Sequence, residues 1–150
     1  MLLVGDIGGT KTDLAIFSTA GGLHIETQAT FRSANYPSLE AIVQEFLADK
    51  GTPITRAVFG VAGPVVNGRS KVTNLPWHLV EEAMQQTLNI PIVKLLNDLE
   101  AIAYAVPHLP ATELEVINGD PTSPPPAGHK GIIAPGTGLG EAILFYHDQN

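Results

Sequence analysis

The chain has 150 residues, and its 8 lysines and arginines against 15 aspartates and glutamates give a formal net charge of −7. This acidic balance argues against a nucleic acid as the main partner, because phosphate backbones are bound by clustered lysines and arginines. The sequence has no cysteine, which excludes a disulfide framework, a thiolate zinc site and a thiol nucleophile, and favours a cytoplasmic location. No apolar run approaches the roughly 18–20 residues that a membrane span requires, so we expect no membrane partner.

The first segment predicts a strand, a glycine-rich turn and a second strand. An apolar run at 2–4 leads into the turn Asp6-Ile7-Gly8-Gly9-Thr10, and a second apolar run follows at 14–17. A glycine pair then marks another turn, before a third strand at about 23–31 whose apolar residues alternate on one face. Three consecutive strands joined by tight turns predict an antiparallel meander.

Helices and strands alternate further along the chain. Ser38 is the natural cap of an amphipathic helix that ends before Gly51. A continuous apolar run at 57–62 is typical of a strand covered on both faces, and Asn67-Gly68 is a hairpin-turn signal. The other predicted elements are a helix at about 78–88, a strand at 91–96, a helix that begins at Asn97-Asp98 and stops at Pro107, and strands at 130–134 and 142–145.

The chain is expected to contain one lobe and the beginning of another. Residues 1–106 predict a small N-terminal lobe with a mixed sheet and helices. Residues 107–129 hold six prolines and predict a linker or crossing. Residues 130–150 predict the first hairpin of a large lobe that is otherwise absent. Because no helices follow to cover the sheet that this hairpin would begin, we expect the chain to be truncated and inactive alone.

The turn at Gly8 and Gly9 could cradle phosphate. Adjacent glycines let the backbone approach a ligand closely, and Thr10 adds a hydroxyl donor. Asp6 would repel a bare phosphate, so its presence beside this turn indicates a divalent cation between the two, such as the hydrated magnesium of a nucleotide. A hairpin turn with an incidental acid remains the alternative. The motif is not a P-loop, because no Gly-Lys-Ser/Thr triplet closes it and a strand follows.

A second glycine-rich turn, Gly136-Thr137-Gly138-Leu139-Gly140, lies near the end of the chain. A dinucleotide-binding fingerprint would need a helix after it, whereas Glu141 and a strand-like apolar run follow. Two Gly/Thr hairpins, each able to hold phosphate oxygens, are a stronger signal than either alone.

Asn97 and Asp98 lie where a strand ends and a helix begins, which is where open α/β sheets place ligands. An aspartate there could be a plain helix cap, or it could accept a hydrogen bond from a substrate hydroxyl and orient it for attack on a γ-phosphate. Asn97 offers a donor and an acceptor to a sugar hydroxyl. Thr73 and Asn74 could contact substrate hydroxyls or merely satisfy a turn. The five histidines show no metal-ligand spacing and are expected at the surface.

Five segments carry a combined signal: Asp6–Thr10, Gly60–Pro64, Thr73–Trp77, Leu96–Ala101 and Ala134–Gly140. In their order and spacing, they resemble the bacterial glucokinase family, which belongs to the actin-like superfamily. The resemblance implies an α/β, ribonuclease H-like actin-type fold and ATP-dependent phosphorylation of glucose at its 6-hydroxyl, in a cleft between two lobes. Members are longer than this chain, and the missing part would supply further sugar ligands and the adenosine-binding motif.

The resemblance and the residue chemistry described above together give the expected roles of individual residues. The catalytic base is expected at Asp98, and Asp6 is expected to hold Mg²⁺ through water. ATP and Mg²⁺ are implied as cofactors, glucose as the substrate, and a homodimer as the state of the full-length protein. Sugar ligands are expected at Asn97, Thr73, Asn74 and Gly136. Nucleotide ligands are expected at Asp6, Gly8, Gly9, Thr10, Lys11, Thr12, Gly136, Thr137 and Gly138.

Three other functions stay open at this point. The nearest is another sugar kinase of the repressor/open-reading-frame/kinase group, acting on fructose, mannose or an N-acetylhexosamine; such kinases usually carry a cysteine-rich zinc motif in the half that is missing here. A non-catalytic sugar sensor of the same fold would be favoured by a DNA-binding helix-turn-helix ahead of the lobe, whereas this sequence begins at its first strand. A stand-alone structural module would need a closed second domain, which the ending at Phe145 does not supply.

Overall fold

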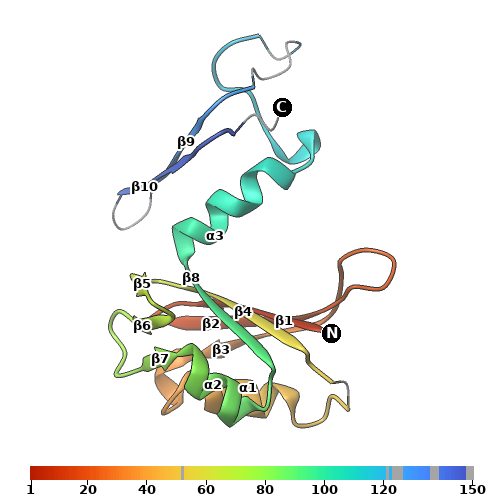
Figure 1. Ribbon diagram of the computed structural model, residues 1–150, viewed down its shortest axis with the longest axis vertical. Coiled ribbons are helices and arrows are strands. Elements are labelled where there is room, and N and C mark those ends of the chain that lie inside the picture. Colours follow the sequence, from red (N-terminus) through yellow and green to blue (C-terminus); the bar gives the residue numbers. More distant parts are fainter. Residues whose placement is uncertain (52, 121, 123–126, 136–138, 148–150) are drawn as a thin grey trace. The chain divides into compact units, whose positions relative to one another are not determined.

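A computed structural model describes residues 1–51, 53–120, 122, 127–135 and 139–147. The chain divides into two compact units, Met1–Asp98 and Leu99–Asn150, whose elements are labelled in Figure 1. The lobe and linker boundaries expected from the sequence stay predictions. Among the described residues, no helix combines the length and the apolar character needed to cross a membrane.

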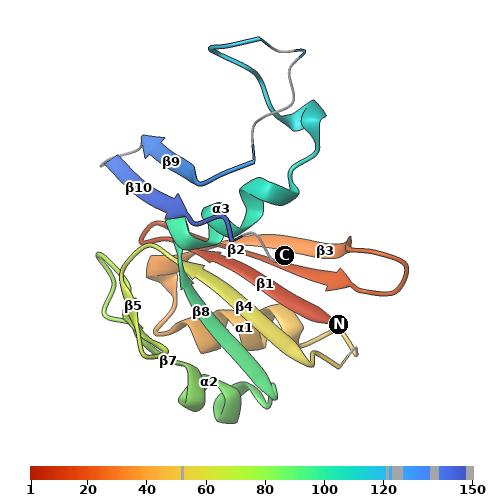
Figure 2. The same ribbon diagram turned by 45° about the horizontal axis from the view of Figure 1, so that its top comes forward.

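The first unit is built on a five-stranded mixed sheet in the order β3-β2-β1-β4-β8. β1 (Leu2–Ile7), β2 (Lys11–Ser18) and β3 (His24–Arg32) form the predicted antiparallel meander. β4 (Arg56–Val61) lies parallel to β1, and β8 (Ile92–Asn97) lies parallel to β4. Figure 2 shows these three parallel strands side by side. Their carboxyl ends therefore meet at one edge of the sheet.

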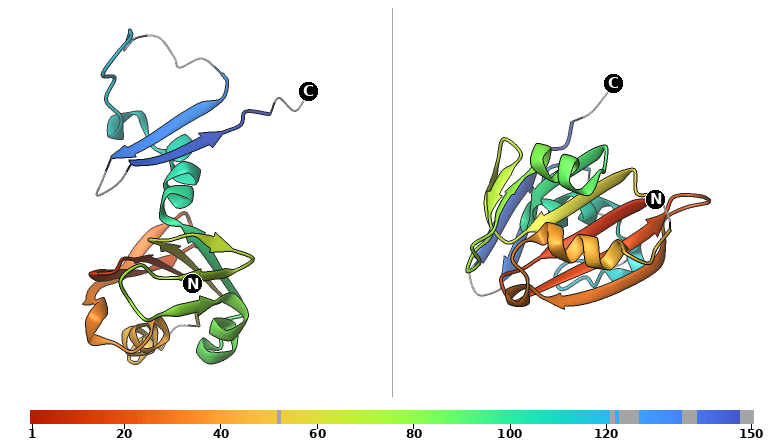
Figure 3. Two further views of the ribbon diagram at one scale, coloured as in Figure 1. Left: turned by 90° about the vertical axis from the view of Figure 1, so that its left-hand side faces the viewer. Right: turned by 90° about the horizontal axis from the view of Figure 1, so that it is seen from below.

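One face of this sheet carries the core of the first unit. α1 (Leu39–Leu47) and α2 (Glu81–Leu88) both lie across that face (Figure 3). The Oγ atom of Ser38 accepts a hydrogen bond from the Ala41 amide, which confirms the predicted cap of α1. Sheet and helices bury one hydrophobic cluster, which includes Leu3, Ile7, Leu14, Leu39, Ile42, Val43, Phe59, Val61 and Met84.

A small second sheet, in the order β5-β6-β7, belongs to the same unit. β5 (Val65–Val66) and β6 (Arg69–Lys71) form the hairpin predicted at Asn67-Gly68. Asn67 has φ 50° and Gly68 has φ 69°. Two consecutive left-handed residues are what a tight two-residue hairpin of type I′ requires, so the sequence signal is confirmed.

The helix expected at about 78–88 begins later than predicted. Residues His78–Val80 form the strand β7, which pairs antiparallel with β6, and the helix begins only at Glu81. The amide of Glu81 donates to the Gly68 carbonyl at 3.0 Å. Pairing with β6 therefore overrides the helical spacing of the first apolar residues in this segment.

Two predictions about strand faces were wrong. The register between β2 and β3 shifts at Phe17, which pairs with Ile25. Ile25 therefore leaves the face that carries Ala29 and is 57% exposed. In β4, burial alternates along Arg56–Val61, with Phe59 fully buried and its neighbours half-buried, rather than being uniform on both faces.

The second unit contains the end of one helix and a hairpin. α3 (Asp98–Ala105) begins directly after β8 and is followed by two short 3₁₀ turns, η2 (Val106–His108) and η3 (Ala111–Glu113). β9 (Lys130–Pro135) and β10 (Leu139–Leu144) pair antiparallel, which confirms the hairpin predicted near the end of the chain.

Candidate functional site

Three strand ends bring the sequence-predicted residues of the first unit to one sheet edge. Ile7, Val61 and Asn97 are the last residues of β1, β4 and β8, and they are register partners across the sheet. The glycine turn, defined here as residues 8–12, follows β1, and Asp98 follows β8. Open α/β sheets bind ligands outside the carboxyl ends of their strands, so this edge is the candidate site.

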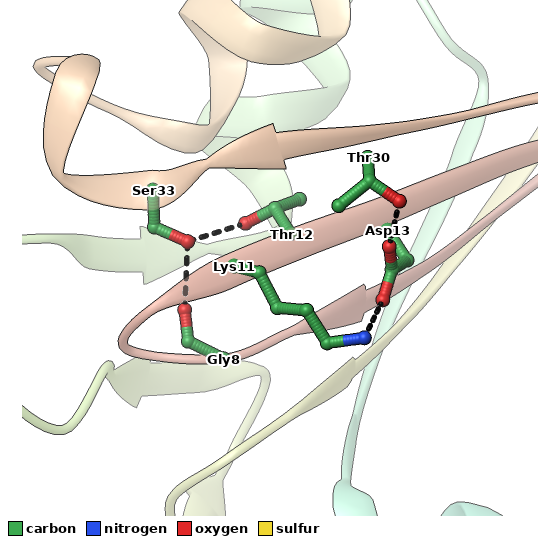
Figure 4. A network of polar contacts seen from close by, with 6 residues as sticks. All are labelled: Gly8, Lys11, Thr12, Asp13, Thr30 and Ser33. Atoms are coloured by element: carbon green, nitrogen blue, oxygen red, sulfur yellow. Dashed lines mark hydrogen bonds and ion pairs between the residues drawn. The ribbon is translucent and has the colours of Figure 1, made fainter.

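Ser33 supports the glycine turn from inside the fold, as Figure 4 shows. It begins the 3₁₀ turn η1 (Ser33–Asn35), and its Oγ donates to the Gly8 carbonyl at 2.8 Å and lies 3.0 Å from the Thr12 Oγ1. Its amide donates to the Thr10 carbonyl at 3.1 Å. Ser33 and Thr12 are both fully buried. The Thr12 hydroxyl belongs to this buried cluster. The contact between Thr12 and a nucleotide, which the sequence predicts, stays a prediction.

Lys11, Asp13 and Thr30 form a second polar network beside the turn (Figure 4). The Lys11 Nζ lies 2.7 Å from the Asp13 Oδ2, and the Thr30 hydroxyl donates to the same carboxylate. The hydrogen bond from Lys11 and then that from Thr30 lower the pKa of Asp13 below its ordinary value. The same contact with Asp13 raises the pKa of the exposed Lys11 ammonium. Lys11, which the sequence predicts as a nucleotide ligand, is thus paired with Asp13.

Asp6 lies directly opposite Asp13 in the β1–β2 ladder, and both line an open hollow of about 570 Å³. Desolvation by the surrounding protein and repulsion by Asp13 raise the pKa of Asp6 above its ordinary value, and Lys11 partly opposes them. The charge of Asp98 raises this pKa further. Two carboxylates that the sequence predicts for metal binding and catalysis therefore lie within electrostatic reach of each other. A carboxylate with a perturbed pKa, as Asp6 has, is typical of functional sites.

The Thr73-Asn74 turn packs directly against the glycine turn. A Cβ placed on Gly9 would lie 2.6 Å from the Thr73 carbonyl oxygen, so only glycine permits this approach. The Thr73 Oγ1 donates to the Ala62 carbonyl at 3.0 Å, and Asn74 adopts a left-handed backbone with φ 64°. The structure therefore brings this turn to the same sheet edge, and its contact with a sugar stays a prediction.

Asn97 is fixed in orientation at the end of β8. Its Nδ2 donates to the Gly63 carbonyl at 3.0 Å, which joins the end of β8 to the loop that follows β4. Asp98 is the first residue of α3 and directly follows Asn97, the last residue of β8. The predicted residues of the second glycine-rich turn, Gly136, Thr137 and Gly138, lie outside the described residues.

The residues at this edge fit a magnesium ion that arrives with a nucleotide. Among the described residues, no group of three or more histidines, aspartates or glutamates could hold a metal ion by itself. Asp6 supplies one carboxylate beside the glycine turn. Mg²⁺ keeps several waters and is commonly held by one or two carboxylates together with substrate phosphates, so no larger ligand set is needed. All five histidines are exposed, as expected.

The chain matches solved sugar kinases over nearly its whole length. A crystal structure of glucokinase from an Antarctic psychrotroph is 33% identical, with a TM-score of 0.84, and the match covers 99% of this chain and 47% of that one. A ROK family glucokinase from Streptomyces griseus, solved in complex with glucose and AMPPNP, is 23% identical, with a TM-score of 0.61, over 97% of this chain and 44% of that one. The second likeness concerns the fold alone. The fold is that of the actin-like sugar kinases, as the sequence resemblance implied.

Sequence comparison narrows this class to one family. The family model described as Glucokinase matches residues 3–150. The curated glucokinase of Nostoc punctiforme is 43% identical over 154 residues, which cover all of this chain and 44% of the relative. The chain belongs to the glucokinase family, which confirms the predicted resemblance. It spans less than half the length of these curated relatives.

Proposed function

We propose that this chain carries one wall of the active site of an enzyme that transfers the γ-phosphoryl group of ATP to the 6-hydroxyl of glucose. The observation that carries the proposal is the shared sheet edge of Asp6, the glycine turn and Asp98, in a member of the glucokinase family. Relatives named as glucokinases support glucose as the substrate, and the glucose and AMPPNP in the Streptomyces griseus structure support a sugar and ATP as ligands.

Asp98 acts on the attacking hydroxyl in this proposal. Its carboxylate accepts the hydrogen bond and then the proton of the glucose 6-hydroxyl, while the oxygen forms a bond to the γ-phosphorus and the bond from that phosphorus to the ADP oxygen breaks. Asp98 holds this position as the first residue of α3, and a carboxylate is a weak base. A weak base suffices, because positioning counts for more than base strength in a loose phosphoryl-transfer transition state.

The glycine turn and Asp6 act on the nucleotide. The backbone of Gly8, Gly9 and Thr10 would cradle the phosphates, with the N–H groups of Gly9 and Thr10 facing them, since the Gly8 N–H donates to the Lys11 carbonyl at 2.9 Å. Lys11 would add a positive charge. Asp6 would hold Mg²⁺ through water, and the ion, when bound, neutralises charge on the phosphates. Gly136, Thr137 and Gly138 are proposed as the second phosphate-binding turn, with Thr12 as a further nucleotide ligand.

We assign the other side chains at this sheet edge to sugar binding. Asn97, held by the Gly63 carbonyl, would meet a sugar hydroxyl with its amide, and Thr73 and Asn74 would contact hydroxyls from the neighbouring turn. Gly136 is proposed to approach the sugar as well. A cytoplasmic location, which the absence of cysteine favours, and a homodimer of the full-length protein complete the proposal. Light scattering on the full-length protein tests the dimer.

A coupled kinase assay on the full-length protein, with glucose, fructose, mannose and N-acetylhexosamines, tests the function. We expect glucose to be the preferred substrate. We expect Asp98→Asn to lower kcat by about 100-fold or more, the range typical of a lost general base. Asp49→Asn, an exposed aspartate just beyond α1, is the matched control and should keep full turnover. Absence of phosphorylation of every hexose would refute the kinase assignment, and full turnover by Asp98→Asn would refute the assigned base.

A further inference from the structure

Ser33 contacts three alternate residues of the glycine turn. Its Oγ bonds with the Gly8 carbonyl and the Thr12 hydroxyl, and its amide bonds with the Thr10 carbonyl. The side chain is fully buried, so it faces no solvent that could replace these partners. The sequence pattern gives no signal for this residue, because its side-chain partners are 21 and 25 positions away.

The hydroxyl groups form a directed chain. A serine hydroxyl has one proton, and the proton of Ser33 is donated to the Gly8 carbonyl. The 3.0 Å contact between Thr12 and Ser33 therefore has Thr12 as its donor. Removing the Ser33 hydroxyl would leave a half-buried acceptor at Gly8 and a buried donor at Thr12 without their partner.

The bond to Gly8 also fixes the peptide that joins Gly8 to Gly9. No cis peptide bond occurs among the described residues, so the carbonyl and the N–H of this peptide point in opposite directions. Because the Gly8 carbonyl is directed at Ser33, the Gly9 N–H is directed away from Ser33. Backbone N–H groups attract a phosphate and carbonyl oxygens repel it, so this orientation decides whether the turn can bind an anion.

We infer that Ser33 is a positioning residue for the nucleotide: it holds the Gly8–Gly9 peptide with its N–H toward the phosphates and its carbonyl inward. This inference rests on the proposed assignment of the glycine turn to ATP. Glycines have little intrinsic preference among backbone conformations, so a turn with two of them depends on such a contact to keep one peptide orientation. Ser33 itself touches no ligand in this role.

Nucleotide affinity of the full-length protein tests the inference. For Ser33→Ala we expect the Kd of Mg·ADP, measured by titration calorimetry, and the KM for ATP to rise about tenfold, which corresponds to one hydrogen bond to a charged group. The KM for glucose should change less than about twofold, since the sugar side of the edge is untouched. Ser38→Ala is the matched control: it removes the same group from the cap of α1 and should leave nucleotide affinity unchanged.

A merely structural role gives a different result. Loss of folded protein would lower the apparent kcat and leave the KM for ATP at its wild-type value, and that outcome would overturn the inference. If Ser33→Ala does not fold, Ser33→Cys retains the volume but donates weakly, and it should show the same rise in Kd; wild-type affinity in a folded Ser33→Cys would also overturn it. Because Mg·ADP binding needs no sugar, a protein that phosphorylates no hexose but loses nucleotide affinity in Ser33→Ala would refute the proposed function and support this inference.

Discussion

Gly9 and Thr73 approach so closely that a side chain on Gly9 has no room: a Cβ built there lies 2.6 Å from the Thr73 carbonyl oxygen and 3.5 Å from the Asn74 Cβ. Side chains do not approach a backbone oxygen within 3.0 Å, so one of the two turns would have to move. The turn assigned to phosphate and the turn assigned to sugar are thus in direct contact.

We expect Gly9→Ala to displace the glycine turn and to raise the KM for ATP at least about tenfold, with a loss of about 1–3 kcal/mol of stability from overpacking. Steady-state kinetics with varied ATP and thermal unfolding of the full-length protein measure both effects. Gly51→Ala is the control, because a Cβ at that exposed position meets nothing within 4 Å. If Gly9→Ala retained the wild-type KM and stability, the contact with Thr73 would not constrain the turn.

The parts of the fold that the sequence predicts correctly are those with a local cause. Ser38 caps α1 through the amide three residues ahead, and Asn67-Gly68 adopts the left-handed backbone that its two residues favour. The parallel strand ends place Asn97 beside Val61, as expected for an α/β sheet. Each of these features depends on residues that are adjacent in the sequence or on a general rule of sheet topology.

The parts that the sequence does not predict depend on distant residues. The start of α2 is set by pairing of β7 with β6, and the exposure of Ile25 is set by a register shift opposite Phe17. The role of Ser33 follows from the path of β3, which brings it back to Gly8. A common serine with no special spacing gives no signal until the tertiary structure places it.

The ion pair of Lys11 and Asp13 predicts a pH dependence of stability. Lys11 and Thr30 lower the pKa of Asp13 in the folded protein below its ordinary 3.8. Ionised Asp13 therefore stabilises the fold above its unfolded-state pKa, and this contribution is lost as the pH falls through the lower folded-state value. Asp6 is relieved of repulsion when Asp13 is neutralised, so the net contribution is small.

We accordingly expect Asp13→Asn to lower the stability of the full-length protein by less than about 1 kcal/mol at neutral pH, as is usual for an exposed ion pair. The difference from wild type should be constant above about pH 5 and should shrink in more acidic buffer. Urea unfolding over a series of pH values measures it, with Asp49→Asn as the control. A difference that grew on acidification would contradict the assigned direction of the Asp13 pKa shift.

Substitution of Asn97 is expected to change the KM for glucose selectively. Asn97→Ala removes the amide that the Gly63 carbonyl orients, and with it a proposed hydrogen bond to a glucose hydroxyl. We expect the KM for glucose to rise about 10-fold to 100-fold and the KM for ATP to change less than about threefold, because the glycine turn keeps its own contacts. Gln44→Ala, which truncates an exposed amide on α1, is the control. Equal increases in both KM values would show that Asn97 supports the whole edge rather than the sugar.

Glu81 connects three segments of the first unit from a buried position. Its Oε1 accepts a hydrogen bond from the Leu95 amide at 2.9 Å, and its Oε2 accepts one from the Lys94 Nζ at 3.0 Å. Its own amide donates to the Gly68 carbonyl, and a Cβ on Gly68 would lie 2.8 Å from the Oε2. One carboxylate thus ties the start of α2 to β8, the strand that ends at Asn97.

We expect Glu81→Gln to destabilise the full-length protein by about 1–3 kcal/mol, because the buried charge-assisted bonds are lost and a side-chain amide is turned toward the Lys94 ammonium or the Leu95 N–H. Glu82→Gln changes the next residue, which is exposed, and should leave stability unchanged within about 0.5 kcal/mol. Chemical unfolding of the two variants side by side makes the comparison. Because Glu81 acts on the middle of β8 and not on its end, the KM values of the folded Glu81→Gln protein should stay near those of wild type. Large changes in those values would mean that the position of β8 controls the site through Asn97 and Asp98.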